Sequence, residues 1–286
     1  MIKRNKTRRD IIRKSIIYFG LISYALFVLF PFAIMLISSF KYKEETIGAF
    51  TWWPEMGFTL RGYINALGKV ASSTSIVEGF FNTLWIIIPP TVIGLLVSSL
   101  SAFAFAKLRF RGKKVMFGLL IATMMVPGIV TLVPSYIIWD YLGVTANAPF
   151  IPLMIPGMFG AAACVFFMRQ AIFAIPDSII EAAKIDGLGT FGCFTRIVLP
   201  LVKPALLAQG ILGFVAGYND YFGPLIYLKS DYQTLQIAVS IFSDRYSGDW
   251  PSILAANVIA IIPTILIYIF AQKYFIEGIT AGGEKG

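Results

Sequence analysis

The sequence predicts an all-α polytopic membrane protein with six transmembrane helices. Its 286 residues are 57% hydrophobic and 14% charged, whereas soluble domains are typically about half apolar and about a quarter charged. The apolar residues form continuous runs of about 20, the length needed to cross a hydrocarbon core of about 30 Å. A transmembrane β-barrel would instead show alternating segments of about ten residues.

Six apolar segments are expected to make a single transmembrane domain over residues 1–286. The first follows the basic stretch MIKRNKTRRDIIRK. Its apolar run is too long for a signal peptide and no small-residue cleavage site follows it, so we expect a retained span. Prolines such as Pro127 predict kinks within the spans. The expected spans are about 15–37, 79–106, 115–138, 149–168, 204–228 and 251–274.

The distribution of Lys and Arg predicts that both termini are cytoplasmic. Residues 1–14, 107–114 and 169–203, together with the C-terminal tail, hold most of the 24 Lys and Arg residues, as the positive-inside rule requires of cytoplasmic pieces. The net charge of +9 is therefore a topology signal. Nucleic-acid binding would need a basic soluble face, and none is predicted.

Several chemistries are disfavoured by composition. The chain has no His, and its two cysteines, Cys164 in a span and Cys193 in a loop, suggest neither a structural disulfide nor a metal site. No GxxxxGK[ST] pattern is present, so this chain is not expected to bind ATP by that route. We expect no catalytic residue, no metal and no bound cofactor.

The loop before the second span contains the cluster Trp52–Trp53–Pro54. Amphipathic aromatic residues anchor proteins at the membrane–water interface. The cluster is therefore either an interfacial belt or a docking surface for an external partner.

The stretch between spans four and five predicts a cytoplasmic helical hairpin at about 176–200. Ser178 followed by Glu181 has the spacing of a capping box, and Gly187 suits a helix stop. A second short helix is expected over Thr190–Val198, ended by Pro200. From composition alone, this hairpin is either a docking element, here called a handle, that another protein binds, or a linker that covers the ends of the neighbouring helices.

The spacing within this stretch favours the handle. Glu181-Ala182-Ala183, then Gly187, then nine residues to Ile197-x-Leu199-Pro200, resembles the EAA signature of ABC importer permeases. The sequence pattern IP-x-S-x-x-EAA-x-IDG is similar to that of the carbohydrate-uptake, maltose-type branch. The six expected spans and the C-terminal sequence QKYFIEGITAGGEKG resemble the MalG-like subunit of that branch. The resemblance implies the type I ABC importer permease (MetI-like) fold, with the hairpin as a coupling helix.

The resemblance also implies roles for individual residues. Glu181 would reach a basic partner on a cytoplasmic ATPase, Ala182 and Ala183 would fill the wall of its cleft, and Gly187 would allow a sharp turn and close backbone approach. The extreme C-terminus would reach between the ATPase subunits. The remaining residues implied are Asp186, Ile197, Leu199 and Pro200 in the hairpin, and Gly282, Gly283, Glu284, Lys285 and Gly286 in the tail.

Together with this chain, the implied partners form a complete transporter complex in a bacterial or archaeal plasma membrane. They are a second, MalF-like permease, a homodimeric cytoplasmic ATPase that binds ATP and Mg, and an extracytoplasmic solute-binding protein. The chain would contact the lipid bilayer and would transport nothing alone.

A polar and aromatic group lies in the fifth span. It consists of Tyr218, Asn219, Asp220 and Tyr221. Polar groups inside a span are costly and are therefore functional by default. Sugars are bound by planar hydrogen-bonding groups and aromatic faces, so these residue types suit a sugar pathway. The alternative is that Asn219 and Asp220 cap a helix break. Asn82 and Asn257 are weaker pathway candidates, since a single Asn in a span more often forms a hydrogen bond between helices.

These observations favour the permease subunit of an ATP-driven ABC importer for a sugar or oligosaccharide. A polyol or glycerol-3-phosphate remains an alternative substrate. An ion-driven secondary transporter would favour internal repeats and several midplane carboxylates, of which Asp220 is the only strong candidate. A membrane scaffold would leave the EAA spacing unexplained.

Overall fold

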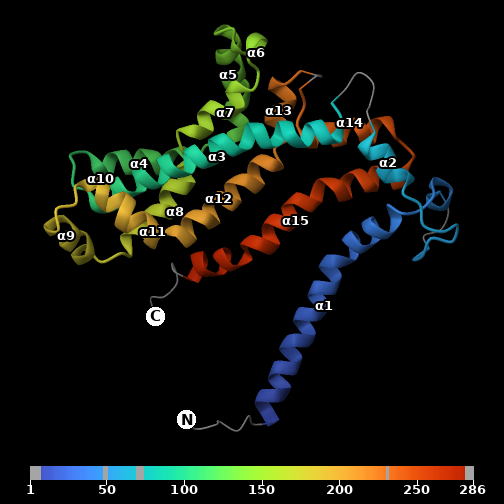
Figure 1. The fold of residues 1–286 in the computed structure, drawn as a ribbon, viewed down its shortest axis with the longest axis horizontal. Coiled ribbons are helices and arrows are strands. Elements are labelled where there is room, and N and C mark those ends of the chain that lie inside the picture. Colours follow the sequence, from blue (N-terminus) through green and yellow to red (C-terminus); the bar gives the residue numbers. More distant parts are fainter. Residues whose placement is uncertain (1–7, 48–50, 69–73, 230–231, 281–286) are drawn as a thin grey trace. The chain divides into compact units, whose positions relative to one another are not determined.

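The computed structural model describes residues 8–47, 51–68, 74–229 and 232–280, and this part of the chain is helical without strands (Figure 1). Four of its helical segments are long and apolar enough to cross a membrane: Ile12–Ser38, Ile76–Lys107, Ile151–Phe173 and Trp250–Lys273. Two bent helix pairs bring the number of candidate spans to six, if each pair counts as one. The predicted multi-pass helical architecture is confirmed.

The elements follow one another in the order labelled in Figure 1. They are α1 (Arg8–Ser38), η1 (Lys43–Thr46), α2 (Arg61–Leu67), α3 (Ile76–Lys107), α4 (Lys113–Thr123), α5 (Gly128–Tyr141), α6 (Val144–Asn147), α7 (Ile151–Met158), α8 (Ala162–Phe173), α9 (Asp177–Ile185), α10 (Thr190–Cys193), the π-helical turn η2 (Phe194–Val198), α11 (Leu199–Leu201), α12 (Lys203–Tyr218), α13 (Phe222–Tyr227), α14 (Leu235–Arg245) and α15 (Trp250–Thr280).

The chain forms two compact units. The first comprises Met1–Gly68 and Ile241–Ile259, and the second comprises Lys69–Ser240 and Ala260–Gly286. Within the first, α2 packs closely on the start of α15. A Cβ on Gly62 would lie 2.8 Å from the Pro251 carbonyl oxygen, so this packing requires glycine, and Asn65 donates a hydrogen bond to Ser252 at 3.0 Å.

The tryptophan cluster also lies in the first unit. Trp52 and Trp53 are exposed, and Pro54 is buried. Trp52 makes an edge contact with Phe30, with ring centroids 5.7 Å apart, and Trp53 makes one with Phe58 at 5.4 Å. The exposed indole rings are compatible with either an interfacial belt or a docking surface.

The second unit is organised around α3, which contacts α7, α8 and α12. The helix begins with a capping box that our sequence reasoning missed: the Ser75 hydroxyl accepts from the Glu78 amide at 3.2 Å, and Glu78 accepts from the Ser75 amide at 2.9 Å. It continues through Pro89 and Pro90 to Lys107, so a span of 32 residues forms the scaffold of this unit.

Two of the expected spans are broken in the structure. The third consists of α4 and α5, which meet at an angle of 95°. Pro127 is the N-cap of α5, and its lack of an amide hydrogen explains the break there. The fifth consists of α12 and α13 and is interrupted after Tyr218. A bend of 78° separates α12 from the Thr190–Leu201 segment that precedes it.

Candidate functional site

The segment between α8 and α12 forms a compact turn of helices, here called the α9 hairpin (residues 176–201). Its first helix, α9, begins at Asp177 with Pro176 as the N-cap, and no side chain caps it. The predicted capping box of Ser178 and Glu181 is therefore wrong, because Ser178 already lies inside the first helical turn.

Gly187 ends α9 as the sequence predicted. Its φ of +87° lies in the left-handed region that glycine adopts without strain. The Leu188 amide donates to the Ala183 carbonyl at 3.0 Å, and the Gly187 amide donates to the Lys184 carbonyl at 3.1 Å. These two bonds are the Schellman arrangement that satisfies the last carbonyls of a helix.

One face of the α9 hairpin is built into the core of the second unit. Ile180 and Ala183 of α9 are buried, as are Cys193, Phe194 and Val198 of the second arm. They belong to one apolar cluster with residues of α3 and α8. For example, the Phe194 ring lies 5.5 Å from that of Phe103 in α3.

The burial of Ala183 corrects one expectation. We expected Ala182 and Ala183 to form a single surface toward a partner, but only Ala182 is exposed, while Ala183 is 6% exposed. Adjacent residues of an α-helix point about 100° apart. In this chain, Ala183 therefore serves the internal packing.

The opposite face of the α9 hairpin is open to the surroundings. Glu181, Ala182 and Asp186 are exposed there, and so are two large apolar side chains, Ile185 at 86% and Phe191 at 67%. Charged groups interspersed with exposed apolar ones are typical of a surface that binds another protein.

The remaining motif residues lie where the second arm meets α12. Ile197 and Leu199 are half-buried and pack against the same cluster, whereas Pro200 is exposed. We expected an ordinary short helix over Thr190–Val198, but the structure has α10 followed by the π-helical turn η2. Such turns occur frequently at functional sites.

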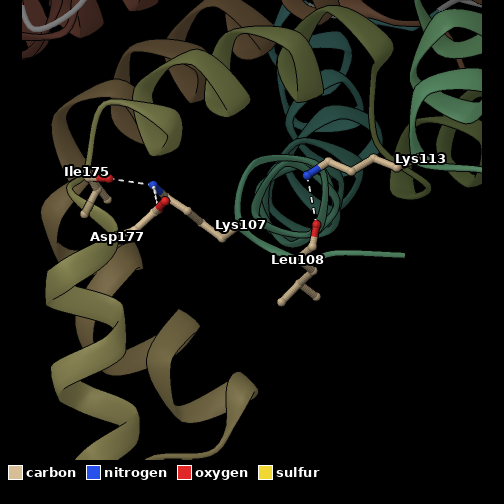
Figure 2. A network of polar contacts seen from close by, with 5 residues as sticks. All are labelled: Lys107, Leu108, Lys113, Ile175 and Asp177. Carbon is tan, nitrogen blue, oxygen red and sulfur yellow. Dashed lines mark hydrogen bonds and ion pairs between the residues drawn. The ribbon is translucent and has the colours of Figure 1, made fainter. Parts of the chain in front are cut away.

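A buried lysine joins the root of the α9 hairpin to the end of α3 (Figure 2). The Lys107 ammonium donates to the Ile175 carbonyl at 2.5 Å and to the Asp177 carboxylate at 2.7 Å. The Lys107 side chain is 6% exposed, while that of Asp177 is 77% exposed. The hydrogen bond from Lys107, and then its charge, lowers the pKa of the Asp177 carboxyl.

A second cation reinforces this junction. The Arg169 guanidinium of α8 donates to the Phe105 carbonyl of α3 at 3.2 Å and lies 4.3 Å from the centre of the Phe117 ring in α4. Lys113, at the start of α4, donates to the Leu108 carbonyl at 2.8 Å (Figure 2). The hairpin root, α3, α4 and α8 are thus tied together by polar contacts as well as by the apolar cluster.

The residues proposed for a substrate pathway occupy different environments. Tyr218 is 1% exposed, and its hydroxyl donates to the Ala260 carbonyl at 2.8 Å, so it ties α12 to α15. Asn219 is the C-cap of α12 and donates to the Val215 carbonyl at 2.8 Å. Asp220 accepts from the Gly223 amide at the start of α13 at 3.2 Å.

The break between α12 and α13 therefore matches the capping interpretation for Asn219 and Asp220. The Tyr221 hydroxyl lies 3.5 Å from the Ser240 hydroxyl. Asn82 donates to the Gln233 carbonyl at 3.0 Å, and Asn257 donates to the Ile253 carbonyl within its own helix at 2.8 Å. The predicted tail residues, 282–286, lie outside the described residues.

The sequence reasoning missed a pocket of about 260 Å³ between α3, the α7–α8 segment and α12. Asp220 lines it, but Tyr218, Asn219 and Tyr221 do not. Three glycines of α12 lie in its wall, at 210, 213 and 217. Their helical spacing places them on one face of α12, and this spacing was the signal in the sequence.

Comparison with known proteins identifies relatives of this chain. A family model described as "Binding-protein-dependent transport system inner membrane component" matches residues 91–280. The arabinooligosaccharides transport system permease protein AraQ of Halalkalibacterium halodurans is 35% identical over 72% of this chain and 74% of its own length. A probable ABC transporter permease protein of Pyrococcus horikoshii is 33% identical over 87% and 90%.

The same fold is found in a solved structure. It is a chain of a bacterial ABC transporter involved in the import of the acidic polysaccharide alginate, which matches with a TM-score of 0.79 over 96% of this chain and 100% of that chain. The sequence identity is 22%. The matched family region, 91–280, contains the α9 hairpin and most of the residues that line the pocket, of which Ile86, Ile87 and Pro90 precede it.

Proposed function

The chain belongs to the family of binding-protein-dependent transport system inner membrane components, and from this premise we propose that it is the transmembrane permease subunit of an ATP-driven importer for a sugar or oligosaccharide. Relatives named as permeases for arabinooligosaccharides, lactose and alpha-glucosides support the substrate class. The chain would form the translocation pathway with a second permease of the MalF-like kind.

The observation that carries the proposal is the two-sided construction of the α9 hairpin. Its buried side is continuous with the core of α3 and α8, while its other side presents Glu181, Ala182 and Ile185. A segment that is fixed to spans and exposed to a partner can carry force between them. We assign the exposed side to docking on a separate, homodimeric cytoplasmic ATPase that binds ATP and Mg.

Force would pass from the hairpin to the spans at its root. When the ATPase dimer closes, it displaces α9, and the contacts of Lys107 with Ile175 and Asp177 transmit the displacement to the end of α3. Because interiors are densely packed, the apolar cluster moves with it. The chain itself contributes no catalytic group, and hydrolysis takes place on the partner.

We infer one further partner and the orientation of the chain in the membrane. A bacterial alginate ABC transporter that contains a chain of this fold has been solved in complex with a periplasmic protein bound to an alginate pentasaccharide, which supports an extracytoplasmic solute-binding protein as a partner. The concentration of Lys and Arg in residues 1–14, 107–114 and 169–203 supports cytoplasmic termini in a bacterial or archaeal plasma membrane.

The proposal is tested by reversing one charge on the exposed face. The Glu181→Lys variant should reach the membrane at the wild-type level but lose most of the ATPase in co-purification and show at least about tenfold slower uptake, the size of an effect at an interface hot spot. The matched control is Glu55→Lys, which reverses an exposed carboxylate of the first loop. Unchanged uptake and ATPase recovery in Glu181→Lys would reject the docking role.

A further inference from the structure

The pocket between α3, α7–α8 and α12 has a distinct electrostatic character. Its single charged lining residue is Asp220, and no Lys or Arg is among the residues that line it. The other polar lining groups are neutral, namely Thr91, Ser98, Cys164, Gln209 and Thr234. The pocket therefore places one negative charge among uncharged hydrogen-bonding groups.

Asp220 retains hydrogen-bonding capacity toward the pocket. One of its carboxylate oxygens accepts from the Gly223 amide at 3.2 Å, and the described residues supply no ion pair to it. A carboxylate has about four acceptor sites. Its unused sites are available to hydroxyl donors of a bound molecule.

Thr234 provides a second and independent indication of a ligand. It lines the same pocket, its side chain is 3% exposed, and within the described part of the chain its hydroxyl has no hydrogen-bond partner. Buried polar groups in native structures are nearly always hydrogen-bonded, and an unsatisfied one calls for an explanation. A solute hydroxyl in the pocket would satisfy it.

We propose that this pocket is a solute subsite that accepts uncharged, hydroxyl-bearing solutes and that Asp220 makes it reject anions. The subsite rests on the proposed transport function and narrows its substrate class to neutral saccharides or polyols. Uronate oligosaccharides and sugar phosphates would meet the like charge of the exposed Asp220 carboxylate, and this repulsion is stronger near a protein surface than in bulk water. Glycerol-3-phosphate would thus be a poor substrate.

The charge of the pocket can be read through Cys164, which lines it. The purified importer, reconstituted so that both faces are accessible, carries Cys193→Ser, which leaves Cys164 as the only cysteine of this chain. It is labelled with a cationic trimethylammonium-ethyl or an anionic sulfonatoethyl methanethiosulfonate. Modification of the Cys164 peptide is followed by mass spectrometry, and each rate is normalised to that of a small free thiol.

We expect the cationic reagent to react faster, and Asp220→Asn to lower the ratio of the two rates by about tenfold. The ratio is informative because the thiolate fraction of Cys164 cancels. Asp244→Asn, at an exposed position outside the pocket, is the matched control and should leave the ratio unchanged. An equal ratio in wild type and Asp220→Asn, or no labelling of Cys164 by either reagent, would overturn the proposal.

Uptake measurements test the hydroxyl-binding side. Thr234→Val, which keeps the shape of the side chain, should raise the apparent KM for a neutral saccharide by about threefold to tenfold. Excess neutral oligosaccharide should protect Cys164 from labelling, and a uronate oligosaccharide should not. Protection by the uronate, or an unchanged KM in Thr234→Val, would contradict the subsite. If the wild-type chain did not associate with an ATPase, the proposed transport function would be contradicted instead. The ratio of labelling rates at Cys164 would still report on the charge of the pocket.

Discussion

The two faces of the α9 hairpin differ in what they contact, although their residues alternate along one short helix. Ile180 and Ala183 face the core shared with α3 and α8, whereas Ala182 and Ile185 face outward. The difference shows that a single motif combines two tasks. One set of residues fixes the hairpin to the spans, and the other set is available to a partner.

The largest expected effect comes from the buried face. Ile180→Ala removes a side chain that is 5% exposed, so it should destabilise the chain by about 2–5 kcal/mol and lower its melting temperature. The control is Ile179→Ala in the same helix, where 42% of the side chain is already exposed. Equal losses of stability in the two variants would contradict the two-faced construction.

The exposed face should respond in the opposite way. Ile185 is 86% exposed, so Ile185→Ala should change the stability of the chain by no more than about 0.5 kcal/mol. If Ile185 is a contact of the ATPase, the same change should weaken ATPase association by about 1–2 kcal/mol. The two quantities are measured by thermal unfolding and by titration of the ATPase. A large loss of stability without loss of association would reverse our assignment.

The turn between the two arms should show a purely conformational cost. Gly187 has a φ of +87°, and a Cβ added to it would meet nothing within 4 Å. Gly187→Ala should therefore cost about 1–2 kcal/mol through the backbone alone, and Gly187→Asn should cost less, since Asn tolerates this region better. Chemical denaturation of the two variants checks the order.

The smallest effect is expected at the root. The Asp177 carboxyl has its pKa lowered by Lys107, so the ion pair stabilises the folded state at pH values above the usual Asp pKa of about 3.9. That contribution is lost as the pH falls below 3.9 through the lowered value. The melting temperature of Asp177→Asn should lie slightly below that of wild type at pH 7, and the two should converge in acid. A difference that persists at low pH would mean that the ion pair is not its cause.

Much of this arrangement could be predicted from the sequence. The six apolar segments, the stop at Gly187 and the helical break next to Asp220 follow from hydropathy and from the preferences of single residues. The division of the hairpin into two faces was not predicted, since Ala183 was expected beside Ala182 on the partner-facing surface. The spacing of Ile180 and Ala183, three residues apart, nevertheless places these two on one side of a helix.

Other features depend on tertiary contacts that a linear pattern does not contain. The capping box predicted at Ser178 is wrong because α9 starts one residue before it, at Asp177. The capping box that the structure does contain, at Ser75, lies in a segment predicted as loop. Tyr218 was expected in a pathway, but its hydroxyl finds a carbonyl of α15, 42 residues away. The pocket forms from three helical segments and is invisible in any one of them.

The central claim, that the exposed side of the α9 hairpin docks on an ATPase, is tested most directly by cross-linking from adjacent positions. In a background of Cys164→Ser and Cys193→Ser, which removes both native cysteines, a single cysteine is placed at position 182 or at position 183. The thiol is labelled with a maleimide that carries a photoreactive benzophenone, and the assembled complex is irradiated so that the benzophenone inserts into a C–H bond of a neighbouring chain. We predict a cross-link to the ATPase from Ala182→Cys and none from Ala183→Cys. Cross-linking from position 183 but not 182, or from neither position in an active complex, would contradict the account.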